Sequence, residues 1–571
     1  MAADRPSGST ELDYDPIEVE IMWNRLGSMV DEASSVLVRS SFSPVVREAN
    51  DFACVLMDAY GRSLAESSLS VPCFNATLPV TMAHFLKRFP AETWRSGDIV
   101  ITNDPWLGTG HLPDFTIATS VFVADRLVGF AGTIAHLSDI GGTLIGADTK
   151  EVFEEGLFVP IMRLASAGKI NEDLMAILKA NVRVPEWVIG DLHAQIAAVE
   201  VLAQRLQEMV LEQGADMLTS IAEVTHRLAE AAMRRAIAAI PDGTYHGAVE
   251  SDGYDEPLRI EATVTVRDDE ITVDYAGSSP QLAIGAVNSP FCYTYAYTAY
   301  PIKCAVDPYT PKNDGSFRPI RVTAPEGSIV NPAYPAAVNA RHLTGQLLSA
   351  VVYGALGDVI PDKVIAESGG APIMCAMFSG TNSDGKRFSE QLFAGGGMGA
   401  RPDRDGLHCT AFPSNSTVGS LEIHESMAPL VFWLKELDVD SGGPGKFRGG
   451  CGQRMVIQVV GDRPITVSFR ADRLKVAAKG YFGGHAGSVT RLTLFSGADA
   501  LANGLAGRGG RAIAPKGQTR LNPGDVIEIV VPGGGGYGPP RERDHARVVA
   551  DLVGGLVSRT TAIDVHGVQV A

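Results

Sequence analysis

Two apolar runs of the chain predict an antiparallel hairpin, and its register fixes where several polar residues lie. Phe115 to Val123 and Leu127 to Ala135 have the residue types of β-strands and flank a short polar turn, Ala124-Asp125-Arg126. If Val123 pairs with Leu127, the ladder places Asp114 directly opposite His136. Because directly opposed residues lie about 4.5–5.5 Å apart, we expect a carboxylate and an imidazole to meet at the open end of the hairpin.

A second histidine, His111, lies three residues before Asp114 in the loop that leads into the hairpin. Imidazole and carboxylate groups supply nitrogen and oxygen ligands that suit Zn²⁺ and could also hold Mn²⁺ or Fe²⁺. With one position left for water, such an ion supplies hydroxide at neutral pH. Hydrogen-bonded structural histidines fit the same spacing, so the residues alone leave both interpretations open. Asp104 and Asp139 are further candidates, as alternative ligands or as groups that orient the ligands.

Length and charge exclude several classes of protein. At 571 residues the chain exceeds one hydrophobic core. Its 48 Lys and Arg against 66 Asp and Glu give a net charge of -18, which argues against nucleic acid or an anionic membrane as the main partner. No apolar run approaches the roughly 18–20 residues of a membrane span, and the first 15 residues lack the apolar core of a signal peptide. We therefore expect a cytoplasmic protein.

Other signatures of chemistry in the sequence are incomplete. Gly380 to Lys386 has the spacing of a phosphate-binding P-loop, but Arg387 stands where Ser or Thr is required and a strand-like run follows, so we predict a hairpin turn. No helix start follows Gly533 to Gly538, which we also predict to be a turn. The seven cysteines are odd in number and form no Cys-x-x-Cys pair, so we predict reduced thiols with packing roles.

Helical and strand patterns are mixed without regular alternation, which predicts a multidomain α+β fold with mixed sheets, long helices in the N-terminal half and a β-rich C-terminal region. We expect a helix capped by Asp15 that ends near Ser40, and a strand from Phe52 to Met57. Helical pattern then dominates from about residue 160 to 240, with an interruption at 181–185 and a break near Gly214.

The pattern changes period at Pro241-Asp242-Gly243, which we interpret as a domain boundary. Beyond it we expect a hairpin of 258–266 with 271–275, a helix at 343–356, glycine-rich strands from about 365 to 540 and a final helix near 546–557. Three domains are therefore predicted. They are an N-terminal α+β metal-bearing domain (1–240), a central α+β domain (241–362), and a β-rich C-terminal domain with a terminal helix (363–571).

Short motifs along nearly the whole chain form an ordered set that is highly specific. They are REANDFACVLMD (47–58), TNDPWLGTGHLPD (102–114), AHLSDIGG (135–142), EEGL (154–157), NVRVP (181–185), GDLHAQ (190–195), NDGSFRPIRVTAPEGSIVNP (313–332), SGGPGKFRGGCG (441–452) and VPGGGGYG (531–538). With them the chain resembles the hydantoinase B family, which includes subunits of N-methylhydantoinases, 5-oxoprolinases and caprolactamase and, more distantly, of acetone and acetophenone carboxylases.

The resemblance implies that Asp51, His111, Asp114 and His136 are the metal ligands and catalytic residues. It adds Asp51, which as the residue before a strand would by itself more often be a capping group. It also implies a partner, a hydantoinase A-like subunit with an actin-like ATPase fold, in a heterotetramer or larger complex. The partner would use ATP to phosphorylate the oxygen of a small cyclic amide, and metal-activated water held by this chain would attack the activated carbon.

Three functional hypotheses follow. The chain is the metal-bearing subunit of an ATP-dependent cyclic amidohydrolase, a subunit of an ATP-dependent ketone carboxylase, or a non-catalytic assembly subunit with a structural metal. Motif position also suggests residues of the substrate pocket, one of which, a tryptophan, replaces a tyrosine that the family often has. These candidates are Arg47, Asn103, Trp106, Arg341 and Glu422.

Overall fold

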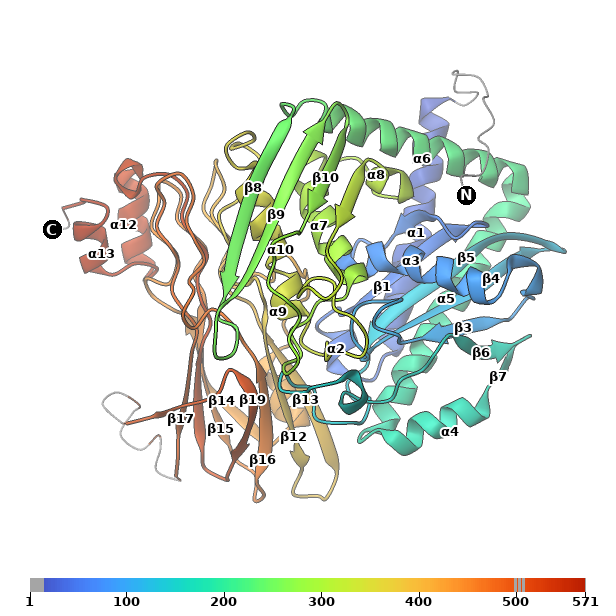
Figure 1. Cartoon of the computed structure of the whole chain (residues 1–571). Helices are drawn as coiled ribbons and strands as arrows, with labels where there is room; N and C mark the ends of the chain where they lie inside the picture. Colours follow the sequence, from blue (N-terminus) through green and yellow to red (C-terminus); the bar gives the residue numbers. More distant parts are fainter. Residues whose placement is uncertain (1–14, 498–500, 502–504, 506–508, 570–571) are drawn as a thin grey trace.

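The computed structural model describes residues 15–497, 501, 505 and 509–569. The chain is a multidomain α+β protein, as predicted, with mixed sheets and helices (Figure 1). The three predicted domain boundaries stay a prediction. Among the helices described, none is long and apolar enough to cross a membrane.

The N-terminal part contains a seven-stranded sheet in the order β2-β1-β5-β4-β3-β6-β7. Its strands are β1 (Phe52–Asp58), β2 (Ser63–Glu66), β3 (Ile99–Thr102), β4 (Asp114–Val123), β5 (Arg126–His136), β6 (Met162–Ser166) and β7 (Lys169–Ile170). The helices of this part are α1 (Pro16–Ser40), α2 (Pro44–Arg47), α3 (Pro72–Arg88), α4 (Glu172–Asn181), α5 (Pro185–Gln213) and α6 (Ala215–Ile237).

Helices cover both faces of this sheet. Helices α1 and α5 pack on one face and share a buried apolar core with it, whereas α3 packs on the other face and contacts α7 of the central part. The predicted first helix is confirmed, with the Asp15 carboxylate accepting from the Ile17 N–H at 2.9 Å. The prediction of helix from about residue 160 was wrong at its start, because β6 and β7 form a short hairpin there that extends the sheet from β3.

The central part adds a four-stranded sheet in the order β11-β10-β9-β8, with helices α7 and α10 between it and the N-terminal part. Its strands are β8 (Gly243–Ser251), β9 (Leu258–Arg267), β10 (Glu270–Asp274) and β11 (Ile320–Thr323). Its helices are α7 (Phe291–Val306), α8 (Asp314–Phe317), α9 (His342–Gly345) and α10 (Leu348–Leu356). The predicted β9–β10 hairpin is confirmed. Helix α7 was not predicted.

The C-terminal part contains two further sheets that pack face to face around a buried apolar core (Figure 1). One has the order β13-β12-β16-β19 and the other β14-β15-β20-β17-β18. The strands are β12 (Met374–Thr381), β13 (Arg387–Ala394), β14 (Leu430–Leu437), β15 (Gln453–Val459), β16 (Ile465–Arg470), β17 (Arg491–Phe495), β18 (Arg511–Ala512), β19 (Lys516–Leu521) and β20 (Val526–Val530). The helices are α11 (Leu421–Met427), α12 (His545–Val553) and α13 (Arg559–Asp564). The predicted final helix near 546–557 corresponds to α12, which ends at Val553, and α13 is a separate helix beyond the predicted range.

The two glycine-containing segments predicted as turns have different outcomes. Strands β12 and β13 pair from Thr381 with Arg387 onward, which confirms the hairpin turn at residues 382–386. The prediction was wrong for Gly533 to Gly538, which is not a turn but packs against other glycine-rich backbone. A Cβ at Gly534 would lie 2.2 Å from the Met398 carbonyl oxygen, so these glycines permit backbones to approach closely rather than to reverse direction.

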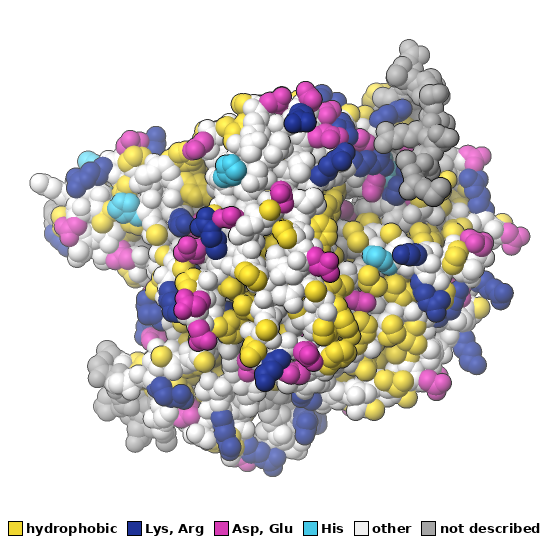
Figure 2. All heavy atoms as spheres, viewed as in Figure 1, with side chains coloured by type: hydrophobic (Ala, Val, Ile, Leu, Met, Phe, Trp, Pro, Cys, Tyr) yellow, Lys and Arg dark blue, Asp and Glu magenta, His cyan; other side chains and the backbone are white. Residues whose placement is uncertain are grey.

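Figure 2 shows acidic and basic side chains interspersed over the face in view, with hydrophobic side chains gathered near its middle. All seven cysteines lie in the described residues and none forms a disulfide, as predicted.

Candidate metal centre

The β4–β5 hairpin brings Asp114 and His136 together in the predicted register, Asp114 opposite His136. Its tip differs from the prediction. Val123 pairs with Arg126 rather than Leu127, so the loop has two residues, the first of which, Ala124, has a φ of 53°. A register shift after Val121 then restores the predicted pairing. The tighter turn changes the register by one residue, and the bulge changes it back before the ladder reaches Asp114 and His136.

Strand β1 places Asp51 on the other side of His136. Phe52 pairs with Ala135. One position further, His136 lies opposite Asp51, and the His136 N–H donates to the Asp51 carbonyl at 3.1 Å. Directly opposed residues project from the same face of a sheet. Three neighbouring strands thus align Asp51, His136 and Asp114 in a row on the face opposite α1 and α5.

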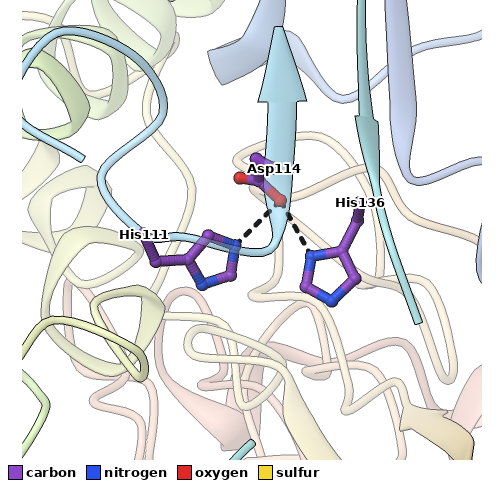
Figure 3. Close-up of side chains that lie close together, drawn as sticks. All are labelled: His111, Asp114 and His136. Carbon is purple, nitrogen blue, oxygen red and sulfur yellow. Dashed lines mark hydrogen bonds and ion pairs between the residues drawn. The ribbon is translucent and has the colours of Figure 1, made fainter. Parts of the chain in front are cut away.

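The loop before β4 adds His111 to this row (Figure 3). Its Nδ1–H donates to the Asn339 carbonyl oxygen at 3.1 Å, and because a carbonyl only accepts, the Nε2 atom carries the lone pair. This Nε2 lies 2.8 Å from the Asp114 Oδ1 atom. Burial, assisted by the Arg341 cation, lowers the pKa of His111 to about 3, so the ring is neutral at physiological pH.

His136 contacts both carboxylates. Its Nδ1 lies 2.8 Å from the Asp114 Oδ1 atom and 3.8 Å from the Asp51 Oδ2 atom, while its buried Nε2 has no hydrogen-bond partner. Candidate ligand atoms of His111, Asp114 and His136 all lie within 4.8 Å of one another. Asp51 lies at the margin of this cluster. Burial raises its pKa to about 6, against the opposing effect of His136.

Arg341 fixes the other oxygen of Asp114. Its Nη2 atom lies 2.6 Å from the Asp114 Oδ2 atom, its Nε–H donates to the Thr109 carbonyl, and its guanidinium lies 4.1 Å from the Tyr293 ring centre. Burial acts to raise the pKa of Asp114, but the Arg341 guanidinium beside it holds the pKa well below its ordinary value. Gly110 permits the close approach, because it has a φ of +90° and a Cβ there would lie 2.7 Å from the Arg341 Cδ atom.

The donor set fits a divalent cation. The His111 Nε2 lone pair and an ionised Asp114 oxygen face each other at 2.8 Å, and a neutral imidazole in this tautomer has no proton to place between them. A cation between them would remove this repulsion and offset the burial of both carboxylates. Two imidazole nitrogens with carboxylate oxygens suit Zn²⁺, Mn²⁺ or Fe²⁺.

A buried glutamate holds the backbone that orients His111. Glu155, in the EEGL motif, accepts from the backbone N–H groups of Val338 and Asn339, both at 2.9 Å, and from the Thr149 hydroxyl at 2.8 Å. Burial raises the pKa of Glu155 to about 7. Glu155 therefore holds the backbone N–H of Asn339, the residue whose carbonyl accepts the hydrogen bond from His111.

Asp104 and Asp139, the two alternative ligands, have structural partners instead. Asp104 accepts from the Trp106 N–H at 2.9 Å within its own turn. Asp139 pairs with Arg183 of the NVRVP motif at 2.6 Å. The candidate cluster in the described residues contains neither of them.

Of the five pocket candidates, only Arg341 lines the cavity beside the cluster. Asn103 donates to the backbone carbonyls of Leu112 and Leu157, and the Trp106 ring nitrogen donates to the Pro332 carbonyl. Arg47 pairs with Glu48, and Glu422 lies in the first turn of α11.

The structure adds cavity residues that the sequence did not suggest. Tyr293 comes from α7, His342 from α9, and Arg470 from the end of β16. No local pattern marks them, because more than 150 residues separate each from the hairpin and only the packing of the three parts brings them to it.

The chain is similar to several known proteins over nearly its whole length. The model of the Hydantoinase B/oxoprolinase family matches residues 15–540. The putative B subunit of the D-/L-hydantoinase of Pseudomonas sp. (strain NS671) is 32% identical, with the match covering 97% of this chain and 95% of that protein. The 5-oxoprolinase of Dictyostelium discoideum is 28% identical over 94% of this chain and 42% of its own length.

Two solved structures have the same fold. The ATP-dependent caprolactamase of Pseudomonas jessenii superposes with a TM-score of 0.89 at 26% identity, covering 98% of this chain and 97% of that chain. Nucleotide-free acetone carboxylase superposes with a TM-score of 0.87 at 21% identity, covering 98% of this chain and 80% of that chain, which shows a shared fold alone. The chain belongs to the Hydantoinase B/oxoprolinase family.

Proposed function

We propose that this chain is the metal-bearing subunit of an ATP-dependent cyclic amidohydrolase of the hydantoinase, oxoprolinase or lactamase type. The observation that carries the proposal is the buried cluster of His111, Asp114 and His136 in a chain of this family. Zn²⁺ is the expected ion, with Mn²⁺ or Fe²⁺ as alternatives. Relatives named as a hydantoinase, a 5-oxoprolinase and a caprolactamase support a small cyclic amide as the substrate.

In this proposal His111, Asp114, His136 and Asp51 hold the ion, and each protein contact has a defined effect. The Asn339 carbonyl keeps the proton of His111 on Nδ1, which leaves Nε2 for the ion. Arg341 holds one oxygen of Asp114 and leaves the other facing the imidazoles. When bound, a divalent ion of this kind activates water near neutral pH and polarises a substrate oxygen.

The partner in this proposal is a hydantoinase A-like ATPase subunit, which uses ATP to activate the amide oxygen. Two relatives of similar length are named as single subunits, the B subunit of a hydantoinase and the beta subunit of a caprolactamase, which supports a multisubunit enzyme. We propose a cytoplasmic complex that is a heterotetramer or larger.

The test is to copurify the chain with its partner and to measure metal content and ATP-dependent ring opening of hydantoins, 5-oxoproline and lactams. In His111→Ala and His136→Ala, bound metal should fall well below one equivalent and turnover by at least about 100-fold. His193→Ala, which changes an exposed histidine on α5, should match the wild type.

Retained metal in the His111 or His136 variant would contradict the ligand assignment. Loss of metal with intact turnover would identify a structural metal. Bicarbonate-dependent incorporation of labelled carbonate, without ring opening, would assign the chain to a ketone carboxylase instead.

A further inference from the structure

A buried arginine without an anionic partner lies beside the candidate metal centre. Arg470 ends β16 and is 1% exposed, and it lines the same cavity as Asp51, His111, His136 and Arg341. Its Nε and Nη2 atoms have no hydrogen-bond partner, and no ion pair joins it to a carboxylate among the residues that the structure describes. Burying a guanidinium without a partner is costly, so the unpartnered N–H groups of Arg470 point to a ligand.

The other buried arginines of the C-terminal part provide a contrast. Arg473, three residues further along, is equally buried but pairs with Glu367 at 2.9 Å. Arg543 pairs with Asp405 and Asp551 at 2.6 and 2.7 Å. Arg470 lacks such a carboxylate, and its unpartnered N–H groups are therefore available to a molecule in the cavity.

The charges around the cavity favour an anionic ligand. The two carboxylates of Asp51 and Asp114 are matched by two guanidinium groups, Arg341 and Arg470. The net charge of these four side chains is therefore zero. The Arg341 cation is already committed to Asp114 at 2.6 Å. A divalent ion at the proposed ligands would leave the buried site with two excess positive charges, which an entering anion with two negative charges would neutralise.

The geometry points to Arg470 as the residue that binds the phosphoryl group carried by the activated amide oxygen, and we propose this as its role. The inference rests on the proposed function for the source of that group. A guanidinium presents its N–H groups in a planar fork that matches phosphate oxygens. The cavity, at about 40 Å³, exceeds the roughly 10–15 Å³ that a single water requires, so it has room for a small group beside Arg470.

Isothermal titration of the full chain with inorganic phosphate tests this role without turnover or partner. Wild-type protein, with and without added Zn²⁺, is compared with Arg470→Gln, Arg470→Lys and Arg520→Gln, the last changing an exposed arginine on β19 of the same sheet. We expect phosphate affinity to fall at least 10-fold in R470Q and less in R470K, which keeps the charge without the fork. R520Q should bind phosphate as the wild type does.

Two results would overturn the proposal. One is equal phosphate affinity in R470Q, R470K and the wild type. The other is binding of acetate, titrated in parallel, that depends on Arg470 while phosphate binding does not, because this would assign the arginine to a substrate carboxylate. If R470Q does not fold, the phosphate affinity of R470K is the test. A correctly folded R470K with unchanged phosphate affinity would also count against the proposed role of Arg470. Failure of ring opening with intact Arg470-dependent phosphate binding would refute the proposed function alone.

Discussion

Replacing Glu155 with glutamine should stabilise the chain relative to the wild type as the pH rises. Burial raises the pKa of this carboxyl from 4.5 to about 7, although Oε1 accepts three hydrogen bonds. A raised pKa means that the folded state binds more protons than the unfolded state between these values. The wild type therefore loses free energy of unfolding as the pH rises through this window, whereas glutamine, which keeps an accepting oxygen, does not titrate.

The displacement of the pKa from 4.5 to about 7 corresponds to on the order of 3 kcal/mol, at about 1.4 kcal/mol for each pH unit. Roughly 2.5 kcal/mol of this falls between pH 5 and pH 8. With an unfolding entropy of about 2.1 cal/mol/K per residue, a chain of 571 residues should show this as a change in Tm of about 2 °C.

Differential scanning calorimetry between pH 5 and pH 8 measures the effect. The Tm of Glu155→Gln minus that of the wild type should increase by about 2 °C across this range. Glu154→Gln, which removes the same charge from the exposed neighbour, is the matched control and should give a flat difference. The reasoning would be refuted if the Tm difference between Glu155→Gln and the wild type did not change with pH, or if it changed equally for both variants.

Two further predictions concern the contacts of Asp114. Gly110→Ala should cost about 1 kcal/mol or more through its positive φ and, by displacing Arg341, should also weaken metal binding. Gly214→Ala, with a φ of +91° and nothing within 4 Å of the added Cβ, should lower Tm without changing metal affinity, and equal metal affinities in the two variants would contradict this. Arg341→Lys should lower metal affinity about 10–100-fold in a competition titration, because lysine cannot hold both Asp114 and the Thr109 carbonyl; unchanged affinity would show that Asp114 needs no such support.

The sequence could predict the part of the site that one local element builds. Asp114 and His136 belong to a single hairpin, so strand alternation and a short turn were sufficient to pair them even though the tip register was wrong by one residue. Asp51 requires the pairing of β1 with β5, which joins segments about 80 residues apart. No local pattern encodes that register, and only the family resemblance supplied the residue.

Tertiary packing accounts for the elements that the sequence pattern did not predict. Helix α7, FCYTYAYTAYPIKCAV, has four tyrosines, two threonines and an internal proline among its 16 residues, yet it is buried between two sheets where packing outweighs its weak helix propensity. The short strand β6 is stabilised by pairing with β3, and β7 by pairing with β6. The glycines of 533–538 looked like a turn because the sequence carries no sign of the neighbouring backbones that exclude a Cβ.

The site explains why recognisable motifs extend along nearly the whole chain rather than clustering at the ligands. The N-terminal sheet supplies both carboxylates, but Arg341, which pairs with Asp114, and Arg470, which lines the same cavity, come from the central and C-terminal parts. Burying one partner of an ion pair without the other is strongly destabilising, so the site is complete only when the three parts pack together. Glycine-rich segments that allow close backbone packing, and Glu155 behind the Asn339 carbonyl, preserve that packing. The ligand geometry is local, whereas its charge balance is a property of the whole fold.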